Sequence, residues 1–194
     1  MVKNIDKRAE VLKATLKIVE DKGIEACSVA EIAKVSQTSM GTIYYYFKNK
    51  AGLLDDLYVS IRKEASTATV KDLRVPDNAA NMQSMVTTLF SNYVNFYVAQ
   101  PAKFHFMTAI QTSKTYTTSS TQAYDDFKLL RALYQVGVQQ AFFPKRTLMM
   151  LIACTTGACN QVIASALAQA IPLTQPIIDD VTRICWAMFT APIA

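Results

Sequence analysis

Three consecutive tyrosines are the residues of this sequence whose chemistry most needs an explanation. Tyr44, Tyr45 and Tyr46 stand in the segment TSMGTIYYYFKNK (residues 38–50), between a Gly-Thr pair and a Phe-Lys-x-Lys ending. Neighbouring helical residues lie about 100° apart and a strand buries only alternate ones, so the three rings cannot share one core. At least one phenol must therefore face solvent or a partner.

The other reactive side chains form no pattern typical of catalysis or metal binding. The cysteines have neither a CxxC nor a zinc spacing, and His105 is the only histidine. The sequence has no Gly-rich phosphate loop, and residues 76–194 lack the glutamates that a Glu-x-x-His di-iron bundle requires. We expect no enzyme activity, metal or cofactor. The cysteines are interpreted as small buried hydrophobes of a reducing cytoplasm: Cys27, Cys154, Cys159 and Cys185.

Charge is distributed unevenly along the 194 residues. Residues 1–75 hold 13 Lys or Arg and 10 Asp or Glu, whereas residues 76–194 hold 7 and 5. An apolar fraction of 51% allows a buried core, and the charged start MVKNIDKRAEVLK shows no signal peptide. Turn signals in RVPDNAAN (residues 74–81) mark the change in composition. The sequence therefore predicts a solvated, mildly basic head followed by an apolar body.

The head begins with two amphipathic segments of helical periodicity. The first segment is expected to end before Lys22-Gly23, and its predicted inner face is Ile5, Ala9, Leu12, Leu16 and Val19. Ser28 and Glu31 form the S-x-x-E capping box of a second, short helix. The polar run that follows breaks this helix, and Thr38 or Ser36 is the expected N-cap of the next one.

The third and fourth predicted helices contain the tyrosines and the segment that follows them. In the third helix Met40, Ile43 and Phe47 share one face, so the tyrosines must look elsewhere. Asn49 is expected to cap the fourth helix, whose apolar stripe is Leu53, Leu54, Leu57, Tyr58 and Ile61. Two short helices joined by a tight polar turn and braced on both sides predict a helix-turn-helix.

The segment SVAEIAKVSQTSMGTIYYYFKNKAGLL resembles the DNA-binding signature of the tetracycline-repressor (TetR) family of bacterial regulators. The resemblance extends over about residues 5–62 and includes Gly23, the capped second helix and the block from Gly41 to Lys50. The sequence departs from the family pattern where Gln37 replaces the usual turn glycine, and also at Thr38 and Met40.

The resemblance implies that the second helix of the motif enters the major groove of double-stranded operator DNA. Gly41 would let the backbone approach closely, and Thr42 would touch a base edge or a thymine methyl. Tyr44 and Tyr45 would donate to phosphate oxygens, whereas Tyr46 would pack on its neighbours. The predicted DNA-binding residues are Ser28, Thr38, Ser39, Met40, Gly41, Thr42, Tyr44, Tyr45 and Lys50.

The body shows helical segments and no alternating β pattern, so the chain is expected to be all-α. The predicted helices are residues 82–100, 101–114, 118–143, 145–169 and 176–190. The predicted domains are a three-helix DNA-binding domain at 1–50, a connecting helix at 51–75, and a larger ligand-binding and dimerisation domain at 76–194.

A charge-free stretch from Thr147 to Ile178 is long enough to span a bilayer. It also carries Thr, Asn, Ser and Gln side chains, a heavy polar load for lipid. A helix buried in a protein–protein interface explains both features. We therefore expect no membrane insertion and a homodimer formed through residues 145–190, as the resemblance also implies.

The resemblance further implies that the body binds a small molecule, and the scarcity of body charges favours an apolar or neutral effector. The candidate pocket residues are aromatic, Met and isolated polar side chains: Asn92, Tyr93, Phe96, Phe104, His105, Met107, Tyr124, Phe127, Tyr134, Met150 and Asn160. The leading interpretation is a cytoplasmic, ligand-responsive repressor. The alternative is a helical small-molecule-binding or adaptor protein with a non-functional helix-turn-helix.

Overall fold

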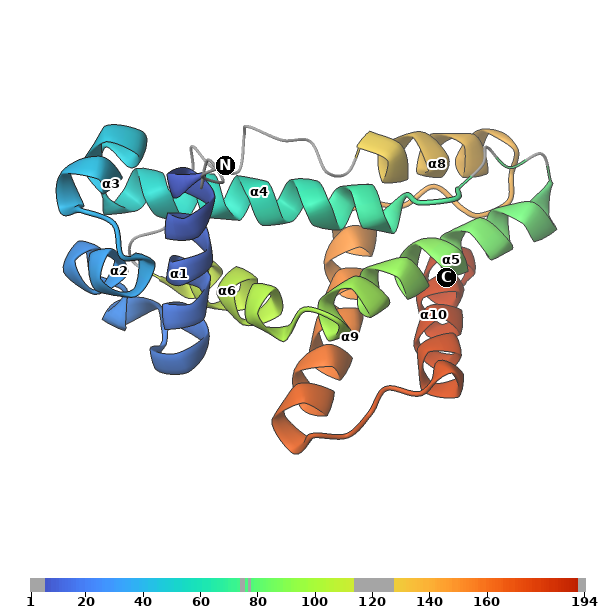
Figure 1. Cartoon of the computed structure of the whole chain (residues 1–194). Helices are drawn as coiled ribbons and strands as arrows, with labels where there is room; N and C mark the ends of the chain where they lie inside the picture. Colours follow the sequence, from blue (N-terminus) through green and yellow to red (C-terminus); the bar gives the residue numbers. More distant parts are fainter. Residues whose placement is uncertain (1–5, 74–75, 77, 114–127, 192–194) are drawn as a thin grey trace, which may run out of the picture. The chain divides into compact units, whose positions relative to one another are not determined.

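The computed structural model in Figure 1 describes residues 6–73, 76, 78–113 and 128–191. Within these ranges the chain forms helices joined by turns, with no strand, which confirms the predicted all-α class. The helices are α1 (Lys7–Lys22), the short 3₁₀ helix η1 (Ile24–Ala26), α2 (Val29–Ser36), α3 (Met40–Phe47), α4 (Lys50–Thr69), α5 (Ala79–Val98), α6 (Pro101–Thr112), α8 (Lys128–Gln139), α9 (Leu148–Gln169) and α10 (Gln175–Thr190).

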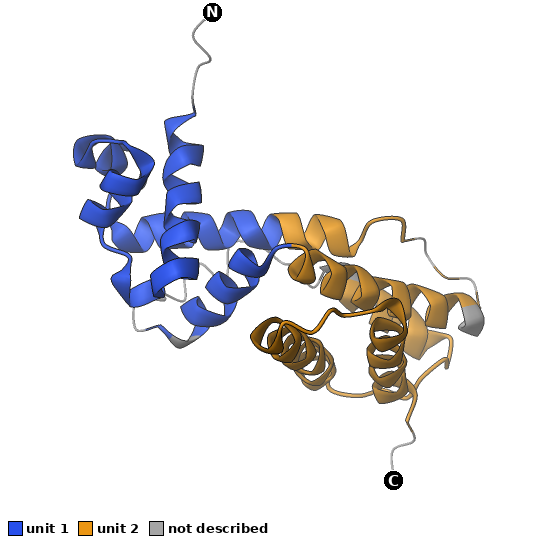
Figure 2. Cartoon of the chain, turned by 60° about the horizontal axis from the view of Figure 1, so that its bottom comes forward, with its two compact units in different colours: residues 1–63, 100–124 blue, residues 64–99, 125–194 orange. Residues whose placement is uncertain are grey.

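The chain divides into two compact units, coloured blue and orange in Figure 2. The head unit comprises residues 1–63 and 100–124, and the body unit comprises residues 64–99 and 125–194. The boundary falls inside α4, so this helix contributes to both units. Helix α6 contacts α1 and belongs to the head unit, although the sequence placed it in the body. The three-part division at residues 50 and 75 stays a prediction.

Helix α1 is the centre of the head unit because α2, α3 and α6 all contact it. Val11 and Ile18 are 0% and 2% exposed and form its innermost positions. The predicted inner face is wrong for Ala9, which is exposed, and Leu16 is only half-buried. Ile5 lies outside the described residues. Neighbours on several sides give α1 a broader buried stripe than a single face predicts.

Side-chain oxygens of Ser28, Ser39 and Asn49 cap the first turns of α2, α3 and α4. The prediction of Thr38 or Ser36 as the cap of α3 is therefore wrong. Thr38 is buried, and its hydroxyl donates to the Ser36 carbonyl at 3.2 Å. Each cap satisfies backbone N–H groups that the first helical turn leaves without a partner.

Two residues other than glycine adopt positive φ at the turns that flank α3. Gln37 has φ of 50° in the left-handed region, at the position where the family commonly has glycine. Lys48 has φ of 61°, and the Asn49 N–H donates to the Phe47 carbonyl at 2.6 Å. A Cβ added to Gly52 would lie 2.5 Å from that carbonyl oxygen. Glycine at position 52 therefore lets α4 start directly against the end of α3.

The core of the body unit lies where α10 contacts α5 and α9. Phe90 of α5 and Phe189 of α10 are 1% exposed, with ring centroids 6.4 Å apart. The Phe143 ring lies 5.5 Å from that of Phe189 and also covers Gly137 of α8. A Cβ at Gly137 would lie 1.9 Å from the Phe143 ring, so only glycine admits this packing.

Helix α8 ends earlier than the sequence predicts. The first part of the predicted 118–143 helix lies outside the described residues, and the described part stops at Gln139 rather than at Pro144. Ala141 has φ of 57°, and the Phe142 N–H donates to the Gly137 carbonyl at 2.8 Å. This left-handed ending satisfies the last carbonyls and turns the chain back onto the helix.

Candidate nucleic-acid interface

Helix α3 buries one side and exposes the other. Ile43 and Phe47 are 1% and 3% exposed and hold the helix in the head unit. Met40, Tyr44 and Tyr45 lie on the outward side, and Tyr45 is 82% exposed. The structure thus explains how three consecutive tyrosines are accommodated: none belongs to the core, and Tyr45 is the most exposed of the three.

Tyr46 lies against its neighbours, as predicted. Its ring makes an edge contact with Tyr45 at 5.4 Å and a tilted contact with Phe47 at 6.1 Å. These contacts steady the Tyr45 ring from the side while leaving its hydroxyl outside. A rigid ring with an exposed hydroxyl loses little side-chain entropy when it binds a partner.

The N-terminus of α3 is exposed to solvent, and the hydroxyls of Ser39 and Thr42 contact each other there. Ser39 Oγ accepts the N–H of Thr42 at 3.1 Å and lies 2.8 Å from Thr42 Oγ1. Gly41 is exposed, and a Cβ there would meet only Ser39 Oγ at 3.8 Å. The backbone of this turn can therefore approach another molecule closely. Thr38 is different, because its side chain is buried and its hydroxyl donates to the Ser36 carbonyl, so its place among the DNA-binding residues stays a prediction.

The start of α2 presents a second hydroxyl. Ser28 Oγ accepts the N–H of Glu31 at 3.1 Å, which leaves its O–H free to donate outward. The reciprocal half of the capping box is not formed, because the Ser28 N–H donates to the Ala26 carbonyl. Glu31 instead pairs with Lys22 at 2.6 Å. The hydrogen bond and charge of Lys22 lower the pKa of the Glu31 carboxyl.

Further contacts fix α3 against α1 and α4. The Arg8 guanidinium donates to Asp56 of α4 at 2.9 Å and lies over the Phe47 ring at 5.5 Å. Lys50 is half-exposed at the first position of α4, where the helix N-terminus also favours an anion. The outward residues of α2, α3 and α4 thus carry hydroxyl and ammonium donors on a braced three-helix frame.

The segment that carries this frame matches a known family. The description "Bacterial regulatory proteins, tetR family" applies to residues 11–57, from α1 to the first part of α4. Over residues 11–57 the chain therefore matches the DNA-binding segment of the TetR family.

Similar proteins agree with this match. The chain is 30% identical over 90 residues to the HTH-type transcriptional regulator BetI of Vibrio vulnificus, covering 46% of each chain. The matched segment thus spans less than half of BetI. A TetR family transcription regulator from Marinobacter aquaeolei VT8 has the same fold, with a TM-score of 0.79, 19% identity and 94% of each chain covered.

A third similar structure contains a ligand. The transcriptional regulator FadR from Bacillus subtilis, solved in complex with stearoyl-CoA, has a TM-score of 0.74 and 14% identity to this chain. The comparison covers 96% of this chain and 99% of that one. At this identity the likeness concerns the fold alone.

The predicted pocket residues that the structure describes are divided between the two units. Phe104 and Met107 of α6 are buried in the head unit, whereas His105 is exposed there. Tyr124 and Phe127 lie outside the described residues. The remaining candidates lie in the body unit: Asn92, Tyr93, Phe96, Tyr134, Met150 and Asn160.

Several of the polar candidates are held by other parts of the protein. Asn92 Nδ2 donates to the carbonyls of Thr69, the last residue of α4, and of Lys71, just beyond it, at 3.3 and 3.1 Å. The Tyr93 hydroxyl donates to Asn160 Oδ1 at 2.7 Å, which ties α5 to α9. Both arrangements satisfy part-buried polar groups and explain these residues structurally.

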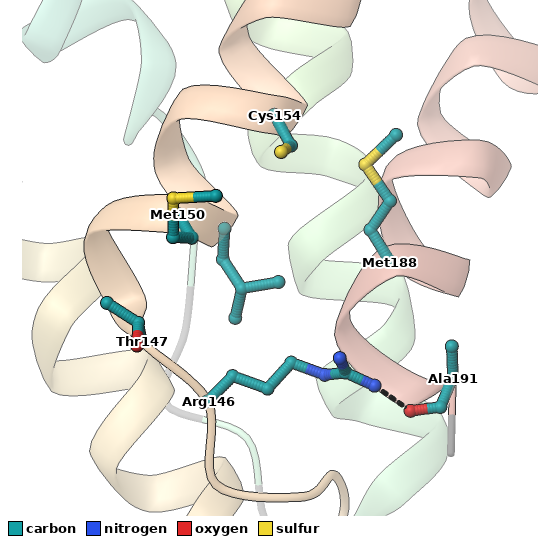
Figure 3. Close-up of a pocket in the computed structure, with 7 residues that line it drawn as sticks. Arg146, Thr147, Met150, Cys154, Met188 and Ala191 are labelled. Carbon is teal, nitrogen blue, oxygen red and sulfur yellow. Dashed lines mark hydrogen bonds between the residues drawn. The ribbon is translucent and has the colours of Figure 1, made fainter. Parts of the chain in front are cut away.

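A hollow of about 560 Å³ opens at the start of α9 and the end of α10 (Figure 3). Met150 is the one predicted pocket residue in its lining. The full lining is Arg146, Thr147, Met150, Leu151, Cys154, Met188 and Ala191. Sequence reasoning missed the others because it favoured aromatic side chains. The available signal was the Lys145-Arg146 pair directly before a charge-free stretch.

Large apolar side chains are exposed on α9 and α10, which contact each other. Met149 and Met150 are 72% and 62% exposed, and Ile184 is 54% exposed. We call this surface the α9–α10 face; its exposed members are Met149, Met150, Ala153, Cys154, Gly157 and Gln161 on α9, and Ile177, Ile184 and Ala187 on α10. Helix α9 is also long and apolar enough to cross a membrane, judged by length and composition alone.

Three of the four cysteines are buried, as predicted, but Cys154 is exposed on the α9–α10 face. Burial raises the pKa of the Cys27 thiol to about 11, so it stays protonated at neutral pH. The sulfur atoms of Cys159 and Cys185 lie 3.8 Å apart between α9 and α10. The hydrogen bond to Cys185, together with burial, raises the pKa of the Cys159 thiol.

Proposed function

We propose that the chain is a dimeric, DNA-binding transcriptional repressor that a small molecule releases from its operator. The observation that carries this proposal is the outward side of α3, with its open N-terminus and exposed tyrosines, in a segment that matches the TetR family.

Helix α3 is the recognition helix of this proposal. Gly41 and Thr42 at its first turn would approach base edges in the major groove, with Met40 beside them. Tyr44 and Tyr45 would donate their hydroxyls to phosphate oxygens on one flank. Ser28 and Lys50, at the starts of α2 and α4, would contact the backbone at helix N-termini, where the dipole favours phosphate.

The α9–α10 face would join two copies of the chain. Exposed apolar side chains such as Met149 and Ile184 are costly in water and gain about 25 cal/mol per Å² of area removed from it. Thr155 and Thr156 of α9 donate to carbonyls one turn earlier, at 2.7 and 2.6 Å, so their hydroxyls would stay satisfied if the helix were covered. A two-fold dimer would read two half-sites spaced by a helical turn or more.

For an effector to release the DNA, it would have to bind more tightly to the conformation in which the two heads cannot bind DNA. A tenfold loss of DNA affinity requires about 1.4 kcal/mol of such preference. Helix α4 belongs to both compact units, which makes it the natural element through which a ligand in the body would act on the head. We expect the effector to be small and largely apolar.

The test is fluorescence anisotropy with labelled DNA taken from upstream of the gene that encodes the chain. We expect specific binding that weakens steeply with salt, because phosphate contacts release counterions. An unrelated duplex of equal length is the control. Equal, weak binding to both duplexes would instead favour a helical ligand-binding or adaptor protein whose helix-turn-helix is non-functional.

Localisation follows from the same proposal. A protein that binds chromosomal DNA must work in the bacterial cytoplasm, and pairing of the α9–α10 face would remove the apolar surface that could otherwise favour a membrane. Fractionation of cells should therefore recover the chain with the soluble proteins. Recovery in the membrane fraction after a high-salt wash would contradict this assignment.

A further inference from the structure

We propose that the hollow between the start of α9 and the end of α10 binds an amphiphilic anion, a short-chain carboxylate with an apolar tail. The assignment deepens the proposed function by naming a ligand class, and only its link to DNA release rests on that function. Ligand sites are commonly 300–1,000 Å³ in volume and apolar, with few polar groups, and the hollow of about 560 Å³ fits this description.

The apolar part of the site comes from four side chains. Met150, Leu151 and Cys154 line the hollow from α9, and Met188 lines it from α10 (Figure 3). Methionine side chains are flexible and polarisable, so they adapt to chains of different shape. Met150 is 62% exposed, and covering it with a ligand tail would remove apolar area from water.

The charged part of the site comes from Arg146. None of the seven lining residues is a carboxylate, so within the described part of the chain the guanidinium has no acidic partner in the hollow. One Nη donates to the Ala191 carbonyl, while Nε is buried without a hydrogen-bond partner among the described residues (Figure 3). A guanidinium carries five N–H donors in a planar fork suited to a carboxylate.

Two features position Arg146 and add positive potential. The Tyr134 hydroxyl donates to the Arg146 carbonyl at 2.5 Å and accepts its N–H, which fixes the backbone before α9. Thr147, at the N-cap of α9, lines the hollow but makes no side-chain cap. The positive end of this 22-residue helix therefore follows Arg146 directly in the chain, and Lys145 is exposed beside it.

The seven lining residues lie on α9 and α10 or directly beside the ends of these helices. The site occupies one end of the α9–α10 face, because Met150 and Cys154 belong to both. Ligand in the hollow would therefore alter the surface that the dimer uses. By changing how the two copies pair, the ligand would change the spacing of the two DNA-binding heads.

The experiment is calorimetric titration of the full chain, without DNA, with octanoate and with octan-1-ol as a neutral probe of equal length. We expect octanoate to bind at least tenfold more tightly than octan-1-ol. Arg146→Gln should abolish this difference. Arg183→Gln is the matched control, since Arg183 is an exposed α10 cation that pairs with Asp180 outside the lining. Equal affinity of the wild-type chain for the two probes, or no binding of either, would overturn the proposal.

A second variant keeps the test decisive if Arg146→Gln does not fold. Cys154→Trp places a large ring in the hollow from an exposed position and should abolish binding of both probes. Retained octanoate binding in this variant would show that the hollow is not the site. Because no DNA is present, a negative result here leaves the DNA-binding proposal intact, and a failure of DNA binding leaves this one intact.

Discussion

The outward sides of α3 and α9 both expose large apolar side chains, yet the two surfaces suit different partners. On α3 the exposed rings of Tyr44 and Tyr45 end in hydroxyls, and the adjoining helices α2 and α4 start at the polar Ser28 and Lys50. On α9 the exposed Met149 and Met150 are followed by Ala, Cys and Gly, without charge. Exposed apolar area alone does not identify a partner; the polar atoms at its ends do.

We expect the largest effect from a substitution on the exposed surface of α9, where it should weaken dimerisation. Gly157 is exposed, and a Cβ there meets nothing within 4 Å in the single chain. Gly157→Glu should therefore fold at least as well as wild type, because any ordinary residue favours a helix more than glycine does. In the dimer interface the unpaired charge should reduce the free energy of dimerisation by about 3 kcal/mol or more, which sedimentation would measure as a dimer at least a hundredfold weaker. Gly157→Ala is the control, and a dimeric Gly157→Glu variant would place the interface elsewhere.

Two glycines of the head separate folding from DNA contact. Gly52→Ala forces a Cβ against the Phe47 carbonyl and should lower the free energy of unfolding by about 1–3 kcal/mol. Gly41→Ala has space for its Cβ and a better helix propensity, so it should not destabilise the head. We expect Gly41→Ala instead to weaken DNA binding by blocking close backbone approach. Urea melts and anisotropy on both variants check this; the reverse pattern would exclude Gly41 from the interface.

The tyrosine hydroxyls give a smaller effect. Tyr45→Phe removes a phosphate donor and should weaken binding to every DNA sequence by about 1 kcal/mol. Tyr46→Phe is the matched control, because Tyr46 packs on Tyr45 and Phe47 and should change affinity little. Equal losses in the two variants would mean that the rings, not the exposed hydroxyl, make the contact.

The smallest effect concerns the exposed Lys22–Glu31 pair. Lys22 lowers the pKa of Glu31 in the folded state, so the pair's contribution is present above the ordinary carboxyl pKa and is lost as pH falls through the lowered one. We expect any difference in melting temperature between wild type and Lys22→Ala to shrink between pH 7 and pH 3. A difference that grows on acidification would contradict the assigned pairing.

Sequence periodicity predicted most helices because their apolar faces repeat with the helical period. The errors in helix caps and helix ends arise where several neighbouring residues could each cap or end the helix. Ser36, Thr38 and Ser39 can all cap a helix, and the left-handed turn at Gln37 decides in favour of Ser39. Likewise Pro144 is the obvious end of α8, but Ala141 adopts the left-handed conformation first.

The ligand site could not be predicted in the same way. The candidate aromatic residues look alike in the sequence, because each is an apolar side chain on a predicted helix. Only tertiary contacts place Phe104 in the head unit and Tyr93 in the body unit. Hydropathy likewise identifies α9 as apolar without separating burial in a core from cover by a partner. The positioning of Arg146 depends on Tyr134, twelve residues earlier, a contact that no local pattern encodes.

The incomplete burial of α9 has a thermodynamic consequence. Only 28% of its most apolar 18-residue stretch is buried within one chain. In the proposed dimer, part of the stability of each copy would therefore depend on pairing with another. Mass action would then make the melting temperature rise with protein concentration. Dilution would lower the stability much as a mutation does, and the number of copies in a cell would help to set the folded fraction of each one.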